Sequence, residues 1–324
     1  MVRGASNLPL SCPSCPKEKP LPQTCYVPEL THREAIDKVW SLYTKVNPCA
    51  RRSSLQHLNI FGIFTNPMLT THRVFLYNNR RIYFTEQKMK IKAIFFDLDG
   101  TLLPMDQEIF INAYLGGLTK KLAPRGYEPK AVAGALWKGT ADMMKNDGKK
   151  RNDQIFWDSF AAILGEDVRG EESHLDEFYA NEFQLVKDVC GYTPMAKELV
   201  EGLKEKGVIV VLATSPLFPK VATDSRIRWS GLEPEDFAYV TTYENSYFCK
   251  PNPLYYTDLC EKLGLDPREV VMVGNDVGDD MVAESAGMKV FLLTDHLINK
   301  SGRDINDFRH GDFAALEKYL EEIL

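Results

Sequence analysis

A chain of 324 residues, of which 44% are apolar and 26% charged, is long enough to bury a full core and has the composition of an ordinary globular protein. Its net charge of −6, and the lack of any apolar run near the roughly 20 residues that cross a bilayer, argue against a nucleic acid or a membrane as partner. The amino terminus lacks the apolar core of a signal peptide, and Cys190, Cys249 and Cys260 are scattered as in reduced proteins. We therefore expect a cytoplasmic location.

Residues 1–88 differ from the rest of the chain in charge and composition. They hold 12 Lys and Arg against 5 Asp and Glu, a net charge of +7 that leaves −13 for residues 89–324. Six prolines crowd positions 9–28, which argues against regular structure there, although residues 34–46 carry apolar side chains at helical spacing. Because Met89 directly precedes an apolar run, we interpret residues 1–88 as a poorly structured, dispensable amino-terminal extension.

The pair Cys12 and Cys15 is the chemical signal within this extension. A Cys-x-x-Cys pair supplies half of a zinc site or a redox dithiol. No second close pair follows, because Cys25 and Cys49 stand alone and would need a residue such as His32 to join them. Chance spacing therefore explains the pair better than metal binding does.

An acidic turn follows the first strongly apolar run of the chain. Residues 91–96 (I-K-A-I-F-F) predict a buried strand of a parallel sheet, which ends at Asp97 and Asp99. Carboxylates two positions apart project from one strand end toward a shared site, while Leu98 points away and Gly100 lets the backbone turn. Their mutual repulsion favours a hard cation such as Mg²⁺ beside them. A solvated acidic turn without function is the alternative.

Residues 105–190 carry apolar side chains at helical spacing throughout. Several amphipathic helices in succession predict a small bundle of their own, inserted beside the acidic turn. Residues 145–151 (K-N-D-G-K-K-R) form a basic loop within it, and a solvated turn explains this loop better than a site for an anionic substrate. Trp137 and Trp157, at helical spacing, are typical of core positions.

From residue 194 onward the pattern alternates between helix and strand. Helices are predicted over residues 195–206, 254–263 and 280–286, and strands over residues 208–213, 237–242, 270–273 and 290–293, the last strand of the sheet. Repeated units of this kind build a parallel sheet with helices on both faces. We predict a doubly wound α/β fold of residues 89–104 and 191–324, with an inserted all-helical domain of residues 105–190.

Polar residues follow two of the later segments. Thr214 and Ser215 come just after a predicted strand, where hydroxyls and backbone amides suit a phosphate oxygen, although a hydroxyl-capped helix start is equally ordinary. Lys250 lies in a loop stiffened by Pro251 and Pro253, and a rigidly presented ammonium suits a phosphoryl group. A lone surface lysine is the alternative.

The segment G-N-D-V-G-D-D, after the strand of residues 270–273, carries Asp276, Asp279 and Asp280 in a glycine-loosened turn. Such oxygen ligands suit Mg²⁺, which takes one or two carboxylates and keeps several waters. Acidic caps for the next helix are the alternative, which we adopt for Asp279.

In this order, the clusters D-L-D-G-T, L-A-T-S, C-K-P and G-N-D-V-G-D-D resemble the four motifs of the haloacid dehalogenase (HAD) superfamily. The resemblance runs from about residue 91 to the carboxyl terminus and implies a Rossmann-like core. The helical insertion resembles the cap of the branch that includes small-molecule phosphatases.

The resemblance also implies a role for each motif residue. Asp97 would be the nucleophile, and Asp99 would protonate the leaving oxygen and later activate water. The remaining roles are phosphoryl binding by Thr214, Ser215 and Lys250, Mg²⁺ binding by Asp97, Asp276 and the backbone carbonyl of Asp99, and support of the metal or the lysine by Asp280. Because Asn275 interrupts the commoner G-D form of the fourth motif, the division of roles among Asp276, Asp279 and Asp280 stays open.

The function that this resemblance implies is Mg²⁺-dependent hydrolysis of a small-molecule phosphate monoester through an aspartyl-phosphate. Asp99 favours phosphate transfer, because the dehalogenases of the superfamily lack the second aspartate. A sugar-phosphate mutase would share all four motifs and is the first alternative. A non-catalytic scaffold is the second, disfavoured because every motif carboxylate is present. We expect a small phosphorylated metabolite as the partner, and a monomer or weak homodimer, while the substrate stays open.

Overall fold

The computed structural model describes residues 72–77, 81–86 and 90–324, and the chain divides into two units, Met1–Lys88 and Met89–Leu324. In the first unit, β1 (His72–Tyr77) and β2 (Arg81–Glu86) pair antiparallel, with His72 opposite Glu86. The sequence analysis did not predict this pair. The predicted helix of residues 34–46 and the Cys12 and Cys15 pair lie outside the described residues.

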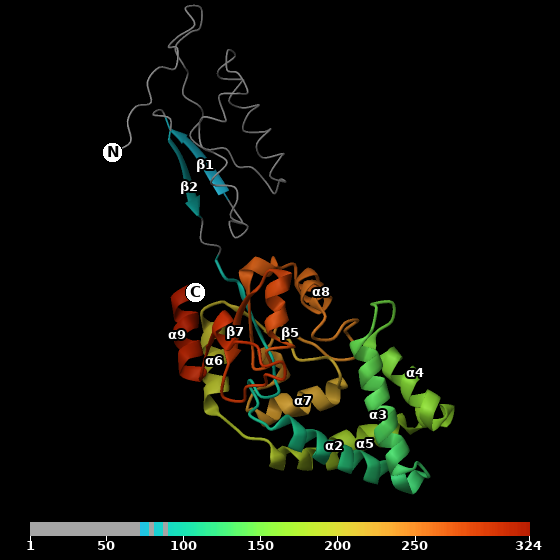
Figure 1. The fold of residues 1–324 in the computed structure, drawn as a ribbon. Coiled ribbons are helices and arrows are strands. Elements are labelled where there is room, and N and C mark those ends of the chain that lie inside the picture. Colours follow the sequence, from blue (N-terminus) through green and yellow to red (C-terminus); the bar gives the residue numbers. More distant parts are fainter. Residues whose placement is uncertain (1–71, 78–80, 87–89) are drawn as a thin grey trace, which may run out of the picture. The chain divides into compact units, whose positions relative to one another are not determined.

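A six-stranded, all-parallel sheet forms the centre of the second unit (Figure 1). Its order is β5-β4-β3-β6-β7-β8, so the chain moves outward from β3 in one direction and then in the other. This arrangement confirms the predicted doubly wound α/β fold. The strands are β3 (Ala93–Phe96), β4 (Ile209–Leu212), β5 (Tyr239–Val240), β6 (Val270–Gly274), β7 (Lys289–Leu293) and β8 (Arg309–Gly311).

Three details of the predicted elements are wrong. The sheet ends with β8, not with the strand near residues 290–293, and β8 has the sequence RHG, which carries no apolar pattern. The strand predicted over residues 237–242 shrinks to the two residues of β5. The helix predicted over residues 280–286 is a 3₁₀ helix, η9 (Met281–Ala286).

Alternate residues of the central strands face two different apolar clusters. Ile94 and Phe96 join the cluster that contains side chains of α6 (Pro194–Glu205) and α9 (Phe313–Ile323). Ala93 and Phe95 join the cluster that contains side chains of α8 (Pro253–Leu263) and η9. This period of two is what a strand covered on both faces requires, and it explains the unbroken apolar run in the sequence.

The residues between β3 and α6 are helical, as predicted. They form α2 (Gln107–Leu122), η4 (Ala123–Arg125), α3 (Pro129–Met144), α4 (Asn152–Leu164), η5 (Glu166–Glu171), α5 (Glu172–Ala180) and η6 (Glu182–Val189) (Figure 1). The chain enters and leaves this insertion side by side, since Met105 and Cys190 form an antiparallel bridge and Gly191 N donates to the carbonyl of Pro104.

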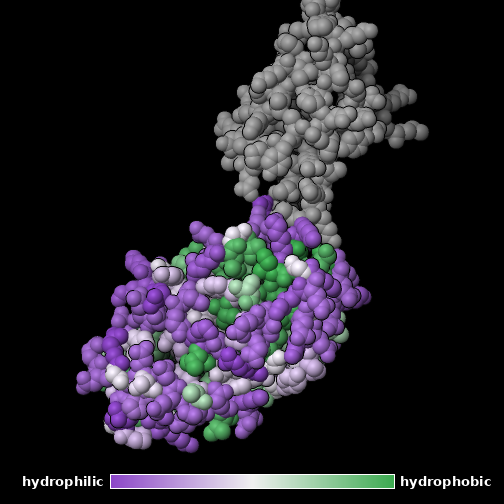
Figure 2. Space-filling view, turned by 180° about the vertical axis from the view of Figure 1, so that it is seen from behind, coloured by the Kyte–Doolittle hydropathy of each residue, from purple (hydrophilic) through white to green (hydrophobic). Residues whose placement is uncertain are grey.

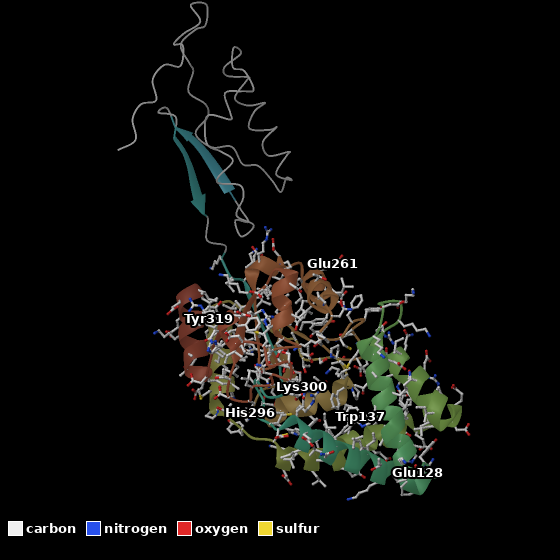
Figure 3. The ribbon with its side chains drawn as sticks, in the orientation of Figure 1. Glu128, Trp137, Glu261, His296, Lys300 and Tyr319 are labelled. Atoms are coloured by element: carbon white, nitrogen blue, oxygen red, sulfur yellow. The ribbon has the colours of Figure 1, made fainter. Side chains whose placement is uncertain are left out.

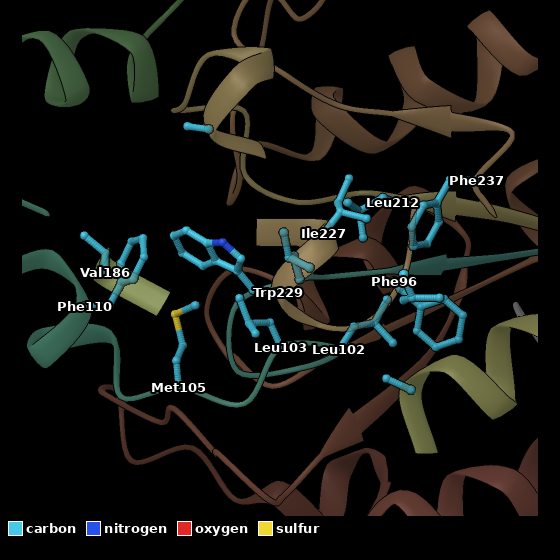
Figure 4. Packing of buried hydrophobic residues seen from close by; sticks show 14 of the residues in the cluster. Phe96, Leu102, Leu103, Met105, Phe110, Val186, Leu212, Ile227, Trp229 and Phe237 are labelled. Carbon is cyan, nitrogen blue, oxygen red and sulfur yellow. The ribbon is translucent and has the colours of Figure 1, made fainter. Parts of the chain in front are cut away.

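The apolar interior of the insertion continues into one face of the sheet. Phe110 of α2 and Val186 of η6 belong to the same buried cluster as Phe96, and Trp229 of α7 (Lys220–Trp229) lies between them (Figure 4). Phe110, Tyr114, Phe178 and Phe183 pack ring against ring within the insertion. The helical insertion and this face of the sheet therefore share one core.

The surface of the second unit is largely hydrophilic, with apolar side chains gathered in one area of the face that Figure 2 shows. Exposed large apolar side chains include Leu185 at 70% and Trp137 at 52%, so the expectation that Trp137 is a core residue is wrong. None of the helices in the described part of the chain is both long and apolar enough to cross a bilayer.

Replacing Phe96 with alanine tests the central packing. Phe96 is fully buried in β3, and loss of a buried phenyl ring is expected to lower the free energy of unfolding by about 3–5 kcal/mol. Ile209, at the start of the neighbouring strand, is 37% exposed, and Ile209→Ala should cost about 1 kcal/mol or less. Urea denaturation followed by circular dichroism measures both. Equal losses in the two variants would contradict this account of the core.

Candidate active site

The motif residues gather where the strand order reverses. Asp97 follows β3, whose neighbours are β4 and β6, and its backbone N donates to the carbonyl of Val273, 2.9 Å away. On the other side, Ala213 N donates to the carbonyl of Phe96 at 2.7 Å, which places Thr214 at the same edge of the sheet. The carboxyl ends of strands at such a reversal are where ligands bind in open α/β sheets.

Lys250 is buried between two carboxylates. Its Nζ lies 2.7 Å from Oδ1 of Asp97 and 2.7 Å from Oδ1 of Asp280, and the side chain is only 1% exposed. Burial lowers the pKa of Lys250, but the negative charges of Asp280 and Asp97 outweigh it and hold the pKa well above its ordinary value. The ammonium therefore stays charged and links the turn after β3 to the turn after β6.

The charged form of Asp97 is disfavoured in spite of its contact with Lys250. Burial raises the pKa of Asp97 to about 7 although Lys250 lowers it, because the charges of Asp280 and Asp99 raise it further. Lys250 and the guanidinium of Arg226, which pairs with Asp99, are two cations against these three carboxylates. A further cation beside Asp97 would favour its ionised form.

Asp280 organises the turn that follows β6. While Oδ1 accepts from Lys250, Oδ2 accepts from the backbone N of Asp276 at 2.9 Å. Gly274 is required beside it, because a Cβ at this position would lie 2.1 Å from Oδ2 of Asp280. Asp280 thus contacts Lys250 directly, and its supporting role stays a prediction.

Asp276 and Asp279 differ in their surroundings. Asp276 Oδ1 accepts from the backbone N of Gly278 at 2.7 Å and of Asp279 at 3.1 Å, which bends the loop around this carboxylate. The Asp279 carbonyl accepts from Tyr256 OH at 2.7 Å. Burial, followed by the charge of Asp276, raises the pKa of Asp279 to about 6.

Asn275, the residue that interrupts the common form of the motif, ties three segments together. Its Oδ1 accepts from Thr101 Oγ1 at 3.0 Å, and its Nδ2 donates to the carbonyl of His296 at 2.7 Å. A Cβ on Gly100, whose φ is +82°, would lie 2.3 Å from Nδ2 of Asn275. The glycine after the acidic pair is therefore required both by its backbone conformation and by the close approach of this side chain.

The loop after β4 is fixed through its backbone. The Thr214 carbonyl accepts from Thr241 Oγ1 at 2.6 Å and from Tyr255 OH at 2.9 Å, and Thr214 is buried. Ser215 is partly exposed. Two buried hydroxyls from other segments thus hold Thr214 in place.

Asp99 contacts an arginine that the sequence analysis missed. Its Oδ2 accepts from Nη1 of Arg226, which lies fully buried on α7, whereas its Oδ1 is buried without a hydrogen-bond partner among the described residues. Burial raises the pKa of Asp99, although Arg226 and Lys250 both lower it. Helical spacing was the available signal, because Arg226 stands between the buried Ala222 and Trp229, four residues before it and three after it.

The helical insertion also contacts the site loops by hydrogen bonds. Asn152, the first residue of α4, is fully buried, and its Nδ2 lies 3.2 Å from Cys249 Sγ and 3.4 Å from the carbonyl of Pro216. In the preceding basic loop, Lys149 pairs with Asp147 and Arg151 with Asp153 at the surface. These pairs agree with a solvated turn, while Asn152 fixes its end beside the second and third motifs.

The donors beside Asp97 fit a hard cation. Among the described residues no group of three or more His, Cys, Asp or Glu side chains could hold a metal ion by itself. Mg²⁺ does not need such a group, because it takes one or two carboxylates together with carbonyls and waters. Asp97, Asp276 and the Asp99 carbonyl are donors of that kind, and the raised pKa of Asp97 shows that its charged form lacks sufficient counter-charge.

A cleft of about 880 Å³ lies beside these loops, between the insertion and the core. Its walls include Met105 and Asn112 after the first motif, Trp137 of α3, and His296 and Lys300, which come after β7 (Figure 3). The carbonyl of His296 is the one that accepts from Asn275. The cleft therefore adjoins the site on both the insertion side and the core side.

The sequence profile of the haloacid dehalogenase-like hydrolases matches residues 91–287, well over half of the chain. The protein belongs to this family. The HAD-like resemblance of the sequence is thus confirmed, and the protein is a hydrolase with the Rossmann-like core of that family.

Individual relatives match more than half of the chain. Phosphoglycolate phosphatase of Haemophilus influenzae (strain ATCC 51907 / DSM 11121 / KW20 / Rd) is 30% identical in an alignment of 247 positions, which covers 71% of this chain and 99% of the relative. Phosphoglycolate phosphatase of Vibrio vulnificus (strain YJ016) is 27% identical over 208 residues, 64% of this chain and 85% of the relative. The crystal structure of a HAD phosphatase from Thermococcus onnurineus is 24% identical, covers 71% of this chain and 98% of its own, and has a TM-score of 0.46.

Removal of the buried ammonium tests the site geometry. Lys250→Met leaves Asp97 and Asp280 buried without their cation, and loss of one partner from a buried ion pair is expected to lower the free energy of unfolding by about 3–5 kcal/mol. Denaturation in metal-free buffer measures this change. Lys262→Met is the matched control, since Lys262 pairs with Asp258 near the surface and should contribute about 1 kcal/mol or less. Similar losses would show that Lys250 is not the central counter-charge.

Proposed function

We propose that this hydrolase is a Mg²⁺-dependent phosphatase that cleaves a small phosphate monoester through an aspartyl-phosphate. The observation that supports this most is the pairing of Asp97 with the buried Lys250. The second carboxylate, Asp99, follows Asp97 by two residues. Lys250 holds one oxygen of Asp97, which orients the other as the attacking atom. A positive charge beside the nucleophile also stabilises the charge that develops on a phosphoryl group in transfer.

The first step forms a bond from an Asp97 oxygen to phosphorus while the bond from phosphorus to the leaving oxygen breaks. Asp99 gives its proton to that oxygen, so that the alcohol leaves neutral. In the second step Asp99 takes a proton from the water that attacks phosphorus, and Asp97 is released with inorganic phosphate. Thr214, Ser215 and Lys250 bind the phosphoryl oxygens in both steps.

Mg²⁺, held by Asp97, Asp276 and the Asp99 carbonyl, would supply charge neutralisation at the phosphoryl group. The donor set supports this choice, because these are the oxygen ligands that Mg²⁺ takes. We leave Asp279 outside the metal site and assign the ligand of the fourth motif to Asp276.

The relatives suggest where to begin with substrates. Phosphoglycolate phosphatases are 27% to 30% identical to this chain, so a small phosphorylated acid such as 2-phosphoglycolate is the first candidate. Lys300 and His296 line the adjoining cleft and would suit its carboxylate. A sugar-phosphate mutase is the alternative, which formation of an isomerised product in place of free phosphate would favour.

The domain boundaries follow from the same proposal. Residues 89–104 and 191–324 would form the catalytic core, residues 105–190 the cap that covers the substrate, and residues 1–88 would not be needed for turnover. The side-by-side entry and exit of the insertion at Met105 and Cys190 supports these limits. We retain the expectation of a cytoplasmic monomer or weak homodimer.

Turnover of p-nitrophenyl phosphate tests the proposed chemistry. The full chain is expected to release phosphate with Mg²⁺ and to stop when a chelator removes the metal, and Asp97→Asn should lose about a thousandfold or more, because the amide cannot form the covalent intermediate. Release of phosphate and circular dichroism of the variant are the measurements. Residues 89–324 alone should match the full chain. Undiminished activity of a folded Asp97→Asn variant would rule the mechanism out.

A pair of aspartate variants tests the metal ligands. Asp276→Asn is expected to raise the Mg²⁺ concentration for half-maximal activity by about tenfold or more, because it removes a charged ligand. Asp279→Asn, in the same loop, is the matched control and should change that concentration by less than about threefold. Titration of activity with Mg²⁺ gives both values. The opposite ranking would assign the metal to Asp279.

A further inference from the structure

Arg226 is the largest fully buried side chain in the described part of the chain, and it lies outside all four motifs. Its Nη1 donates to Oδ2 of Asp99. Its Nε and Nη2 point back onto α7, 3.4 Å from the Ala222 carbonyl and 3.4 Å from Thr223 Oγ1. All three nitrogens of the guanidinium therefore have a partner, which fixes the plane of the group.

Aromatic side chains close the other sides of this guanidinium. Its Cζ lies 4.3 Å from the centroid of the Phe218 ring and 6.0 Å from that of Phe110 on α2. A guanidinium over an aromatic face gains a favourable electrostatic contact, strongest where water is excluded. Arg226 is thus locked between the loop after β4, the first helix of the insertion and Asp99.

This arrangement divides the two oxygens of Asp99. Oδ2 is occupied by Arg226, and Oδ1 is buried with no hydrogen-bond partner among the described residues. Leaving a buried carboxylate oxygen unpaired is unfavourable, so such an atom calls for an explanation. A proton on Oδ1 that is shared with an incoming substrate oxygen supplies one, because Oδ1 is the oxygen without a partner among the described residues.

We propose that Arg226 is a positioning residue for the general acid: it holds Asp99 by Oδ2 and so presents Oδ1 to the leaving oxygen of the substrate. This inference rests on the proposed phosphatase function and adds a residue to it. The proton moves from Oδ1 to the leaving oxygen while the Asp97–phosphorus bond forms and the bond to that oxygen breaks. Arg226 itself exchanges no proton and touches no substrate.

The leaving group decides how much this positioning matters. p-Nitrophenolate is a weak base and departs without a proton, whereas phenolate is much more basic and gains far more from protonation in the transition state. Each variant is compared with the wild type on the same saturating substrate, so a loss that is larger for phenyl phosphate than for p-nitrophenyl phosphate reports on proton delivery rather than on binding. The first turnover is the relevant step, because Asp99 also acts on water in the second step, whichever substrate was used.

The experiment is a rapid-mixing measurement of phenol release in the first turnover by the full chain with Mg²⁺. Arg226→Met is expected to slow this step by about 100-fold with phenyl phosphate and by less than about tenfold with p-nitrophenyl phosphate, with KM nearly unchanged. Arg228→Met is the matched control, since Arg228 lies on the same helix but is exposed and pairs with Glu233. It should leave both rates unchanged.

A second comparison does not depend on the folding of Arg226→Met, in which Asp99 is left buried without its cation. The double variant Asp99→Asn/Arg226→Met carries neither charge and is compared with Asp99→Asn. Because Arg226 acts through Asp99, the added substitution should change either first-turnover rate by less than about threefold. Additive losses, or equal losses of Arg226→Met with both substrates, would overturn the proposal. A wild-type chain without Mg²⁺-dependent turnover of either substrate would instead refute the phosphatase function, and the positioning role with it.

Discussion

The contact of Lys250 with Asp97 and Asp280 is the interaction on which the rest of the site depends. These three charges are withdrawn from water, and none of them is tolerable there without the others. Asp97 and Lys250 are 153 residues apart in the chain, and Lys250 and Asp280 are 30 apart. The charge pairs can therefore form only when the sheet has brought the ends of β3 and β6 together. The site therefore reaches its geometry only when the sheet has folded.

The loops around this contact are held by neutral groups that leave little freedom. Asn275 joins the turn after β3 to the segment after β7, and Tyr255 with Thr241 holds the backbone at Thr214. Gly100 and Gly274 are the places where no side chain fits. The loops of such a site lose their conformational entropy during folding, so the groups need little rearrangement when a substrate binds.

The sequence contained enough to predict the centre of the fold but not its edges. The strands β3, β4 and β6 are buried on both faces, so their apolar runs and the polar residues after them stand out. At the edges, β5 has only two residues, which is too short for a pattern to show. β8 has the sequence RHG, because an edge strand does not need an apolar side chain at every position. The antiparallel pair β1–β2 was missed for a related reason, since its mixed basic and aromatic residues show no clean alternation.

In the site, sequence reasoning singled out residues whose chemistry and position coincide, and it missed a residue for which burial alone decides. Asp97 and Asp280 lie in turns after apolar strands and Lys250 lies in a loop stiffened by prolines, and the structure brings the three side chains into contact. Arg226 lies within a helix, where a cationic residue is ordinarily solvated, and only the three-dimensional packing of Phe218 and Asp99 makes it a buried one. The division of roles among Asp276, Asp279 and Asp280 likewise depends on contacts in three dimensions, and the spacing of the motif does not give these contacts.

Asp97 and Asp99 are paired with two different cations, a lysine and an arginine, and this difference suits the roles that we propose for them. Lys250 is a compact charge with three donors that bridges Asp97 and Asp280 at once, which leaves a third donor for the phosphoryl group of the proposed mechanism. Arg226 is planar and permanently charged, and its stacking on Phe218 fixes a direction as well as a charge. In the proposed mechanism Asp97 is the nucleophile, and Lys250 balances its charge. Asp99 is the proposed proton donor: Arg226 holds its Oδ2, while its Oδ1 has no hydrogen-bond partner among the described residues.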